Sequence, residues 1–179
     1  MFRDLARMTA QLKGLRYEGA LIGRAIWERR SGDTEGVPRV LRDQHGVMEL
    51  MAADASGRLT LVMMLGHAAP VPPQPSECGQ EPAAVRQLRL SVVGDVPAKV
   101  LRLRFSAEDV HAFVRAVGDT NPLHAGMRPL VPGLAILEAA LLHPALAGAT
   151  RAELRFHGAS FAGDEIELTV RTAGPRRQA

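Results

Sequence analysis

The chain has 179 residues, of which 46% are hydrophobic, 4% aromatic and 23% charged, and its formal net charge is +3. This composition predicts one globular domain of ordinary size or two very small ones, and it excludes an intrinsically disordered chain. The mild positive charge does not by itself indicate a nucleic-acid partner. A single cysteine, Cys78, excludes a disulfide framework and a thiolate zinc site and favours a cytoplasmic protein. No apolar stretch is long and uninterrupted enough to predict a membrane span.

Residues 1–68 form the first predicted region, in which one helix is followed by strands. Apolar residues spaced three or four apart predict an amphipathic helix over residues 1–16. The run 20–27 is typical of a strand, and a polar turn is expected at residues 31–36. Val47 to Ala52 and Leu59 to Leu65 are two further apolar runs, and the letters DASG between them indicate the turn of a β-hairpin.

A proline-rich segment, residues 69–84, follows and predicts an exposed linker that contains the cysteine. The remaining region, residues 85–175, opens with strands predicted over 86–92 and 100–105, where apolar and polar residues alternate. The arginines on these strands fit a solvated face. The alternative interpretation is a docking patch for an acidic carrier protein or a nucleotide phosphate.

Two helices are predicted next. Ser106 and Asp109 fit a capping box that begins the first helix, and Gly118 fits its end. The second helix is expected from about Pro132 to near Pro144. Strands at 154–156 and 166–170, separated by a turn at Gly163 and Asp164, complete the expected elements.

The loop between these helices concentrates chemically useful side chains. Asp119, Asn121 and His124 fall within six residues, so that an acid, an amide and an imidazole could face one cavity. Ordinary turn chemistry also explains such a segment, because Asp and Asn side chains bond to nearby backbone in turns. The three residues are therefore candidates for a site, with a surface loop as the alternative.

Glu138 is the second candidate acid. It lies within LAILEAALL, where eight of nine residues are apolar, and a helix that is apolar on all sides is expected to be buried. A buried carboxylate needs a partner, so Glu138 either pairs with an arginine across the core, faces a solvent gap, or acts as an acid or base in a pocket. At the start of the same helix, Pro132 and Gly133 are expected to leave N–H donors free for an anionic oxygen such as that of a thioester enolate.

These motifs resemble two related families. Residues 118–124 match the G-D-x-N-P-x-H signature of MaoC-like (R)-specific enoyl-CoA hydratases. The segment 105–110 resembles the lead-in to that signature, and 156–164 resembles the strand and G-D turn that follow the family's helix. The spacing of His124, Arg128-Pro129, Pro132-Gly133 and Glu138 is similar to the active-site segment of bacterial 3-hydroxyacyl-ACP dehydratases. Together these likenesses cover roughly residues 100–170.

Both families share the hot-dog fold, so the resemblance implies an α+β chain with a curved antiparallel β-sheet wrapped around a long central helix. Only about two strands are predicted after the helix, fewer than a hot dog normally has. We therefore expect a rearranged hot dog or a compressed double one, in which residues 1–68 complete the sheet. Hot-dog proteins form pairs, which implies a homodimer or a heterodimer with another hot-dog protein.

The resemblance implies reversible dehydration of (3R)-hydroxyacyl thioesters to trans-2-enoyl thioesters, in fatty-acid or polyketide metabolism. His124 would be the base, and either Asp119 or Glu138 would protonate the leaving hydroxyl. The Gly133 N–H, at the helix start made by Pro132, would hold the thioester oxygen, and Asn121 would fix the loop. No metal or redox cofactor is expected, because the acyl group is carried on coenzyme A or acyl carrier protein. The alternatives are an acyl thioesterase and a non-catalytic hot-dog subunit that binds acyl chains or a partner.

Overall fold

The structure is a computed structural model that describes residues 2–12, 14–29, 37–66, 70 and 84–173. The predicted turn at 31–36, Cys78, most of the proline-rich segment and the C-terminal tail lie outside the described residues. The described part is an α+β arrangement with an eight-stranded mixed sheet and three α-helices. None of its helices has the length and apolar character needed to cross a membrane.

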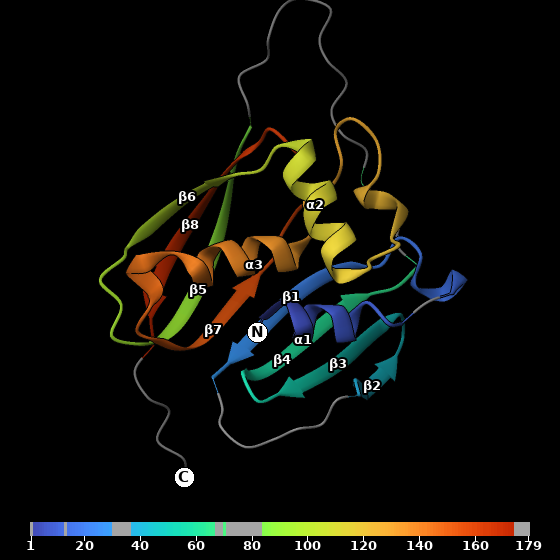
Figure 1. Cartoon of the computed structure of the whole chain (residues 1–179), viewed down its shortest axis with the longest axis horizontal. Coiled ribbons are helices and arrows are strands. Elements are labelled where there is room, and N and C mark those ends of the chain that lie inside the picture. Colours follow the sequence, from blue (N-terminus) through green and yellow to red (C-terminus); the bar gives the residue numbers. More distant parts are fainter. Residues whose placement is uncertain (1, 13, 30–36, 67–69, 71–83, 174–179) are drawn as a thin grey trace, which may run out of the picture.

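Along the chain, one α-helix is followed by six strands, two α-helices and two strands (Figure 1). Three short 3-10 turns, η1 to η3, lie between them. In order, the elements are α1 (Phe2–Thr9), η1 (Leu15–Tyr17), β1 (Leu21–Glu28), β2 (Arg39–Gln44), β3 (Val47–Asp54), β4 (Gly57–Met64), β5 (Val85–Gly94), β6 (Val100–Arg104), α2 (Ala107–Val117), η2 (Pro122–His124), α3 (Gly133–Leu142), η3 (Pro144–Leu146), β7 (Ala149–Arg155) and β8 (Glu165–Thr172).

The strands form one sheet in the order β2-β3-β4-β1-β7-β5-β8-β6. Every neighbouring pair is antiparallel except β5 and β8, which run parallel. The expectation of a purely antiparallel sheet is therefore wrong. The parallel pair arises because the chain leaves β5, passes through β6, α2, α3 and β7, and returns in β8, which inserts between β5 and β6. A parallel pairing needs such a long crossover, whereas a hairpin would give an antiparallel one.

Strand β1 joins the N-terminal strands to the C-terminal ones. Its residues pair with β4 on one side and with β7 on the other, so that Ala25 lies opposite both Leu61 and Leu154. The three side chains are almost completely buried. The strands on either side of the proline-rich segment thus share one sheet and one hydrophobic core.

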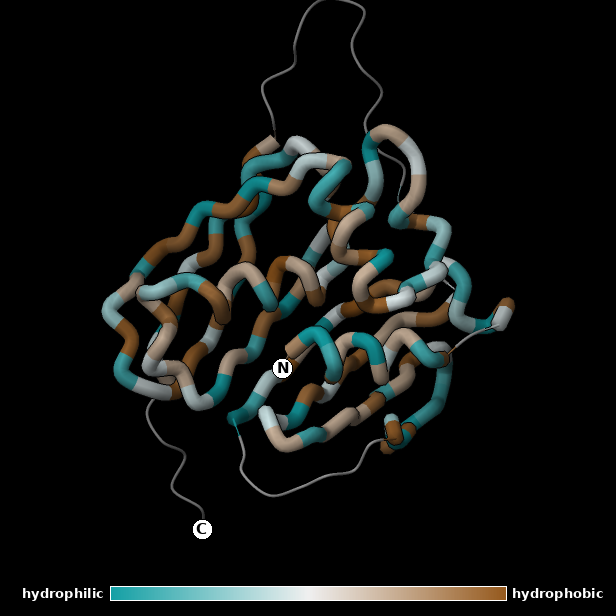
Figure 2. The backbone as a smooth tube through the Cα atoms, viewed as in Figure 1, coloured by the Kyte–Doolittle hydropathy of each residue, from teal (hydrophilic) through white to brown (hydrophobic). Residues whose placement is uncertain are grey.

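The helices lie on one face of the sheet, with α1 packed against β3 and β4 and α3 packed against β1, β6 and β7 (Figure 1). Most of α3 is buried, as its uniformly apolar sequence predicts, and Leu137 is fully enclosed. Along β5 and β6 hydrophobic and hydrophilic residues alternate (Figure 2), which places one row against the helices and the other on the opposite face. Because α3 has ten residues, the expectation of a long central helix is not met.

Two element boundaries and one strand differ from the prediction for physical reasons. The first helix ends at Thr9 rather than residue 16, and the chain then turns through Gly14, whose φ is 116°. Strand β2 was not predicted, because all of its residues are exposed at the sheet edge and leave no hydrophobic pattern. Strand β7 begins at Ala149 rather than at residue 154. The sequence did not show this start because the buried positions Ala149 and Ala152 are small alanines. The predicted hairpin is confirmed, with Asp54 opposite Gly57 at its turn.

Candidate active site

The candidate loop begins where α2 ends. Ser106 and Asp109 form the predicted capping box, in which the Ser106 Oγ accepts from the Asp109 N–H and the Asp109 carboxylate accepts from the Ser106 N–H. The Ser106 hydroxyl also donates to the Asp109 carboxylate. This bond, followed by the one from the Ser106 N–H, lowers the pKa of Asp109 below its ordinary value. At the other end Gly118 has a left-handed conformation, with φ 71°, and its N–H bonds to the Val114 carbonyl. The helix therefore stops at a defined residue and directs the next one, Asp119, toward the interior.

Asn121 fixes the loop to the beginning of β1. Its Oδ1 accepts from the N–H groups of Leu123, at 3.2 Å, and Gly19, at 3.3 Å, while its Nδ2 donates to the Ala20 carbonyl at 2.9 Å. Its own N–H donates to Asp119 Oδ1 at 2.9 Å. The amide thus satisfies backbone groups from two segments about a hundred residues apart. Asn121 therefore holds the loop against the residues that precede β1.

His124 is buried and has a defined orientation. Its Nδ1 lies 2.8 Å from the Leu130 carbonyl oxygen, and the side chain is 8% exposed. Because a carbonyl can only accept, Nδ1 must carry the hydrogen of this bond. In the neutral imidazole the lone pair is then on Nε2, which faces the Asp119 carboxylate. The site therefore presents a base at Nε2 with a fixed direction.

The Asp119 carboxylate and the His124 imidazole face each other at the longest separation that a hydrogen bond allows. Asp119 Oδ2 lies 3.5 Å from His124 Nε2, and the carboxylate is 28% exposed. This separation is longer than an ordinary charge-assisted hydrogen bond. The other carboxylate oxygen is held by the Asn121 N–H, so Oδ2 is the one directed at the imidazole.

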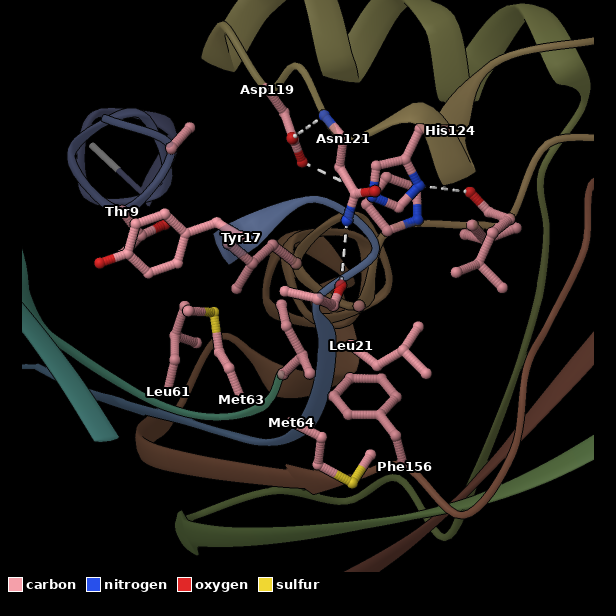
Figure 3. Close-up of a pocket in the computed structure, with 18 of the residues that line it drawn as sticks. Thr9, Tyr17, Leu21, Leu61, Met63, Met64, Asp119, Asn121, His124 and Phe156 are labelled. Carbon is pink, nitrogen blue, oxygen red and sulfur yellow. Dashed lines mark hydrogen bonds and ion pairs between the residues drawn. The ribbon is translucent and has the colours of Figure 1, made fainter. Parts of the chain in front are cut away.

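Both side chains line a cavity of about 480 Å³. Figure 3 shows Asp119, Asn121 and His124 together at one end, with apolar side chains from the sheet below them. The opposite walls come largely from the N-terminal half of the chain. Residues with apolar or weakly polar side chains dominate those walls: Ala6, Leu12, Tyr17, Leu21, Ile22, Leu61, Met63, Met64, Ile136 and Phe156.

The first turn of α3 contributes Pro132 and Gly133 to the same cavity. The Gly133 N–H lies in the first turn, where helices have no internal acceptor, and the described residues provide no hydrogen bond to it. A side chain at this position would collide with Phe156, because a Cβ built on Gly133 would lie 2.8 Å from the ring Cζ. The glycine therefore allows the Phe156 ring to pack against the helix start and leaves a donor beside the cavity.

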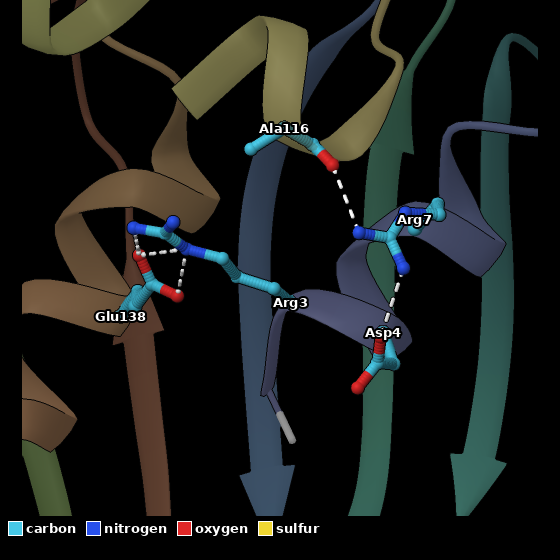
Figure 4. Close-up of polar contacts among 5 residues, drawn as sticks. All are labelled: Arg3, Asp4, Arg7, Ala116 and Glu138. Atoms are coloured by element: carbon cyan, nitrogen blue, oxygen red, sulfur yellow. Dashed lines mark hydrogen bonds and ion pairs between the residues drawn. The ribbon is translucent and has the colours of Figure 1, made fainter. Parts of the chain in front are cut away.

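Glu138 does not belong to this group. It is not among the residues that line the cavity, and Arg3 of α1 binds its carboxylate through two nitrogens (Figure 4). Arg3 Nε donates to Oε1 at 2.8 Å and to Oε2 at 3.1 Å, and a terminal nitrogen donates to Oε2 at 3.0 Å. The hydrogen bond and charge of Glu138 raise the pKa of Arg3. This contact matches the alternative in which Glu138 pairs with an arginine across the core, and Asp119 is the candidate acid that lies beside His124.

The carbonyl that orients His124 belongs to a clamped loop. Leu130 forms an isolated bridge with Phe161, and its N–H bonds to the Leu123 carbonyl at 2.9 Å. Asp164, which is 1% exposed, accepts from Arg128 at 3.0 Å and from the Phe161 N–H at 2.9 Å. A buried carboxylate thus holds the segment that presents the Leu130 oxygen. Sequence reasoning noted Arg128 and Asp164 only as parts of two motifs and did not foresee that they bond to each other.

Several cavity residues were missed by sequence reasoning. Thr9, Tyr17 and Met63 lie in the first 64 residues, far along the chain from the catalytic candidates, and carry no motif. The pairing of β1 with β7 and the packing of α1 against α2 and α3 bring them to the site. Within the described part of the chain, no cluster of three or more His, Cys, Asp or Glu side chains could hold a metal ion. No protein-family model matches the chain, and no curated protein matches it.

Proposed function

We propose that the chain is a rearranged hot dog. The support is the arrangement around α3, where β7, β1, β4, β3 and β2 follow one another in antiparallel order. In a hot dog such strands follow the helix along the chain. Here only β7 follows α3 directly into this row, and residues 21–64 supply the others from the N-terminal side. The G-D-x-N-P-x-H segment then lies at the cavity beside the helix, as the resemblance to the hydratases implies.

We further propose that the protein catalyses reversible dehydration of (3R)-hydroxyacyl thioesters. One observation carries this proposal: the Leu130 carbonyl fixes Nδ1 of His124, and the free Nε2 and the Asp119 carboxylate both face an apolar cavity. Dehydration needs a base for the proton at C2, an acid for the hydroxyl at C3, and an apolar space for the acyl chain. The cavity brings these three features together.

In the proposed reaction, His124 Nε2 takes the C2 proton as the C2–H bond breaks. The bonding electrons form the C2–C3 double bond, and the C3–O bond breaks. The hydroxyl leaves with the C3–O pair and takes a proton from the protonated Asp119 carboxyl, so it departs as water. The proton on Nε2 then passes to Asp119 across the 3.5 Å gap, which restores both groups. Hydration of the enoyl thioester follows the same steps in reverse.

The thioester oxygen gains negative charge when the C2 proton leaves. The Gly133 N–H is a free donor at a helix start beside the cavity, and such a group stabilises an oxyanion. The acyl chain would lie against Leu21, Met63 and Phe156, which replace water around it. No metal or redox group takes part, because the substrate is activated by its own thioester on coenzyme A or an acyl carrier protein.

The test is hydration of trans-2-butenoyl-CoA, which is measured as the loss of the enoyl absorbance. The wild type should hydrate the substrate, and His124→Ala should lose about 100- to 10,000-fold in kcat. Asp119→Asn should lose a comparable factor. His143→Ala is the matched control, because it removes an exposed imidazole from the residue before η3, outside the cavity lining.

Each outcome decides the proposal. Normal hydration by His124→Ala would overturn the assignment of the base. Release of free thiol without hydration would identify a thioesterase instead. A folded wild type that does neither, but retains acyl thioester, would show a binding subunit without catalysis.

A further inference from the structure

Ser160 is a buried residue whose hydroxyl has no hydrogen-bond partner in the described part of the chain. The residue is only 5% exposed. The other buried polar side chains of the described part each make a hydrogen bond; they are those of Thr9, His124, Glu138 and Asp164. Burying a hydroxyl without a hydrogen bond costs free energy. An exception of this kind needs an explanation, and a bound ligand provides one.

The backbone places Ser160 beside the start of α3. Its carbonyl accepts from the Val131 N–H at 2.8 Å, and the next residue, Phe161, forms the isolated antiparallel bridge with Leu130. Continuing that antiparallel register by one residue brings Ser160 opposite Val131, which is two residues before Gly133. The serine is therefore adjacent to the first turn of the helix, where the Gly133 N–H is a free donor.

The Ser160 hydroxyl is open to the candidate cavity. Ser160 lines this cavity together with Gly133, and its oxygen is not fully enclosed by protein atoms. Phe161 does not line the cavity; the centre of its ring lies 5.9 Å from the guanidinium carbon of Arg128. Successive side chains of an extended segment point to opposite sides. The Ser160 side chain therefore points away from Arg128 and toward the cavity.

We propose that the Ser160 hydroxyl is a second hydrogen-bond donor to the thioester oxygen of the substrate, beside the Gly133 N–H. This inference rests on the proposed function, which places negative charge on that oxygen and assigns it only one donor. Both groups belong to the cavity that holds His124 and Asp119. Donors that are already in place where charge develops stabilise a transition state, and the positive end of the α3 dipole acts in the same direction.

The hydroxyl acts without giving up its proton. When the C2 proton moves to Nε2 of His124, the electron pair of the C2–H bond is shared with the thioester oxygen. It then forms the C2–C3 double bond as the C3–O bond breaks. The Ser160 hydroxyl donates a hydrogen bond to the oxygen throughout. Because the oxygen carries more charge in the transition state than in the bound substrate, this bond raises kcat more than it lowers KM.

The alternative ligand for Ser160 is an amide of the carrier arm. A hydroxyl also accepts hydrogen bonds, so an amide N–H of pantetheine is a possible partner. The position beside the free Gly133 N–H favours a carbonyl oxygen, because two donors that lie together match one acceptor. The two ligands affect different kinetic constants, which the experiment measures.

The first measurement is hydration of trans-2-butenoyl-CoA by Ser160→Ala. Its kcat should fall about 10- to 100-fold while KM stays nearly unchanged. Ser160→Thr keeps the hydroxyl and should recover most of this loss. Ser91→Ala is the matched control, because it removes an exposed hydroxyl from β5 outside the cavity lining. The Tm of Ser160→Ala should not fall, since the hydroxyl makes no hydrogen bond with the described residues.

The second measurement detects the contact without turnover. The probe is butyryl-CoA labelled with carbon-13 at the carbonyl, which has no double bond to hydrate. Binding to the wild type should lower the stretching frequency of the labelled carbonyl in difference infrared spectra, because hydrogen bonds to the oxygen weaken the C=O bond. Ser160→Ala should show a smaller shift, and Ser91→Ala should show the wild-type shift.

Three results would overturn the inference. The first is a wild-type kcat and a wild-type carbonyl shift in Ser160→Ala. The second is a raised KM with unchanged kcat, which would assign the hydroxyl to the carrier arm. The third is a wild type that binds butyryl-CoA without a carbonyl shift, or does not bind it.

The inference and the proposed function fail in different ways. The infrared shift needs no catalysis, and hydration by the wild type does not depend on which groups bind the thioester oxygen. A wild type that hydrates the substrate while Ser160→Ala behaves like Ser91→Ala refutes only the second donor. A wild type that converts no thioester but shows a carbonyl shift that Ser160→Ala reduces refutes only the reaction.

Discussion

The ion pair between Arg3 and Glu138 allows a direct test of which carboxylate takes part in catalysis. Replacing Glu138 with Gln removes the charge and places an amide group against the Arg3 guanidinium, where at present both carboxylate oxygens accept. If the glutamate serves only to join α1 to α3, the variant should lose stability and keep its catalytic rate. If it is a catalytic acid, the rate should fall instead.

The size of the stability loss follows from the exposure of the two partners. Exposed ion pairs contribute about 0–1 kcal/mol, and removing one partner of a buried pair costs about 3–5 kcal/mol. The Glu138 side chain is 11% exposed but that of Arg3 is 52% exposed, so solvent screens the pair from one side. We expect Glu138→Gln to cost about 1–2 kcal/mol. For a chain of this length that lowers Tm by about 2–8 °C.

The assay combines thermal unfolding, followed by circular dichroism, with hydration of trans-2-butenoyl-CoA well below Tm. Glu138→Gln should keep kcat within about twofold. Arg3→Gln is the matched variant, because it breaks the same pair from the other side, and the double variant should be little less stable than either single one. A loss of 100-fold or more in kcat with unchanged Tm would refute the structural role of Glu138.

Two further predictions concern the helix starts. Gly133→Ala should lower both hydration activity and stability, the latter by about 1–3 kcal/mol, because the new Cβ would lie 2.8 Å from the Phe156 ring. Gly158→Ala is its control, since that cavity-lining glycine has nothing within 4 Å of an added Cβ, and equal effects of the two would contradict the packing argument. Asp109→Asn should destabilise the protein above about pH 4 and match the wild type at lower pH. The pKa of Asp109 is lowered in the folded state, so its contribution is present above the ordinary carboxyl pKa and is lost as pH falls through the lowered one. Urea unfolding over a pH series measures this, and a difference that grows toward low pH would be the wrong sign.

Local features of the sequence predicted local structure well. The capping box at Ser106 and Asp109 and the left-handed Gly118 are determined by residues within a few positions of each other, and the prediction of both is confirmed. The hairpin around residues 54–57 is likewise a short-range feature. Such signals need no knowledge of distant packing.

Features that depend on distant contacts could not be read in the same way. Arg3 and Glu138 are 135 positions apart, and nothing near Glu138 identifies its partner. The parallel pairing of β5 with β8 depends on the return of the chain after two helices. Strand β2 lacks a buried face altogether, so it produces no pattern at all.

The candidate site likewise has some features that local sequence predicts and others that depend on distant contacts. Asp119, Asn121 and His124 are close in sequence, and their residue types indicated a shared cavity. The side chains of Tyr17 and Met63 reach that cavity only because β1 pairs with both β4 and β7. The direction of the His124 lone pair likewise depends on the Leu130 carbonyl, a backbone group that no side-chain motif reveals.

In the proposed reaction, Nε2 of His124 and the carboxylate of Asp119 move protons at C2 and C3 of an acyl thioester. The most direct measurement is mass spectrometry, with chiral separation, of the product that the wild type and His124→Ala form from trans-2-butenoyl-CoA. The proposed reaction requires that the wild type adds one water and yields the (3R)-hydroxyacyl thioester, while His124→Ala leaves the substrate unchanged over the same time. Release of the free acid and thiol, or the same hydrated product at the same rate from both proteins, would contradict it.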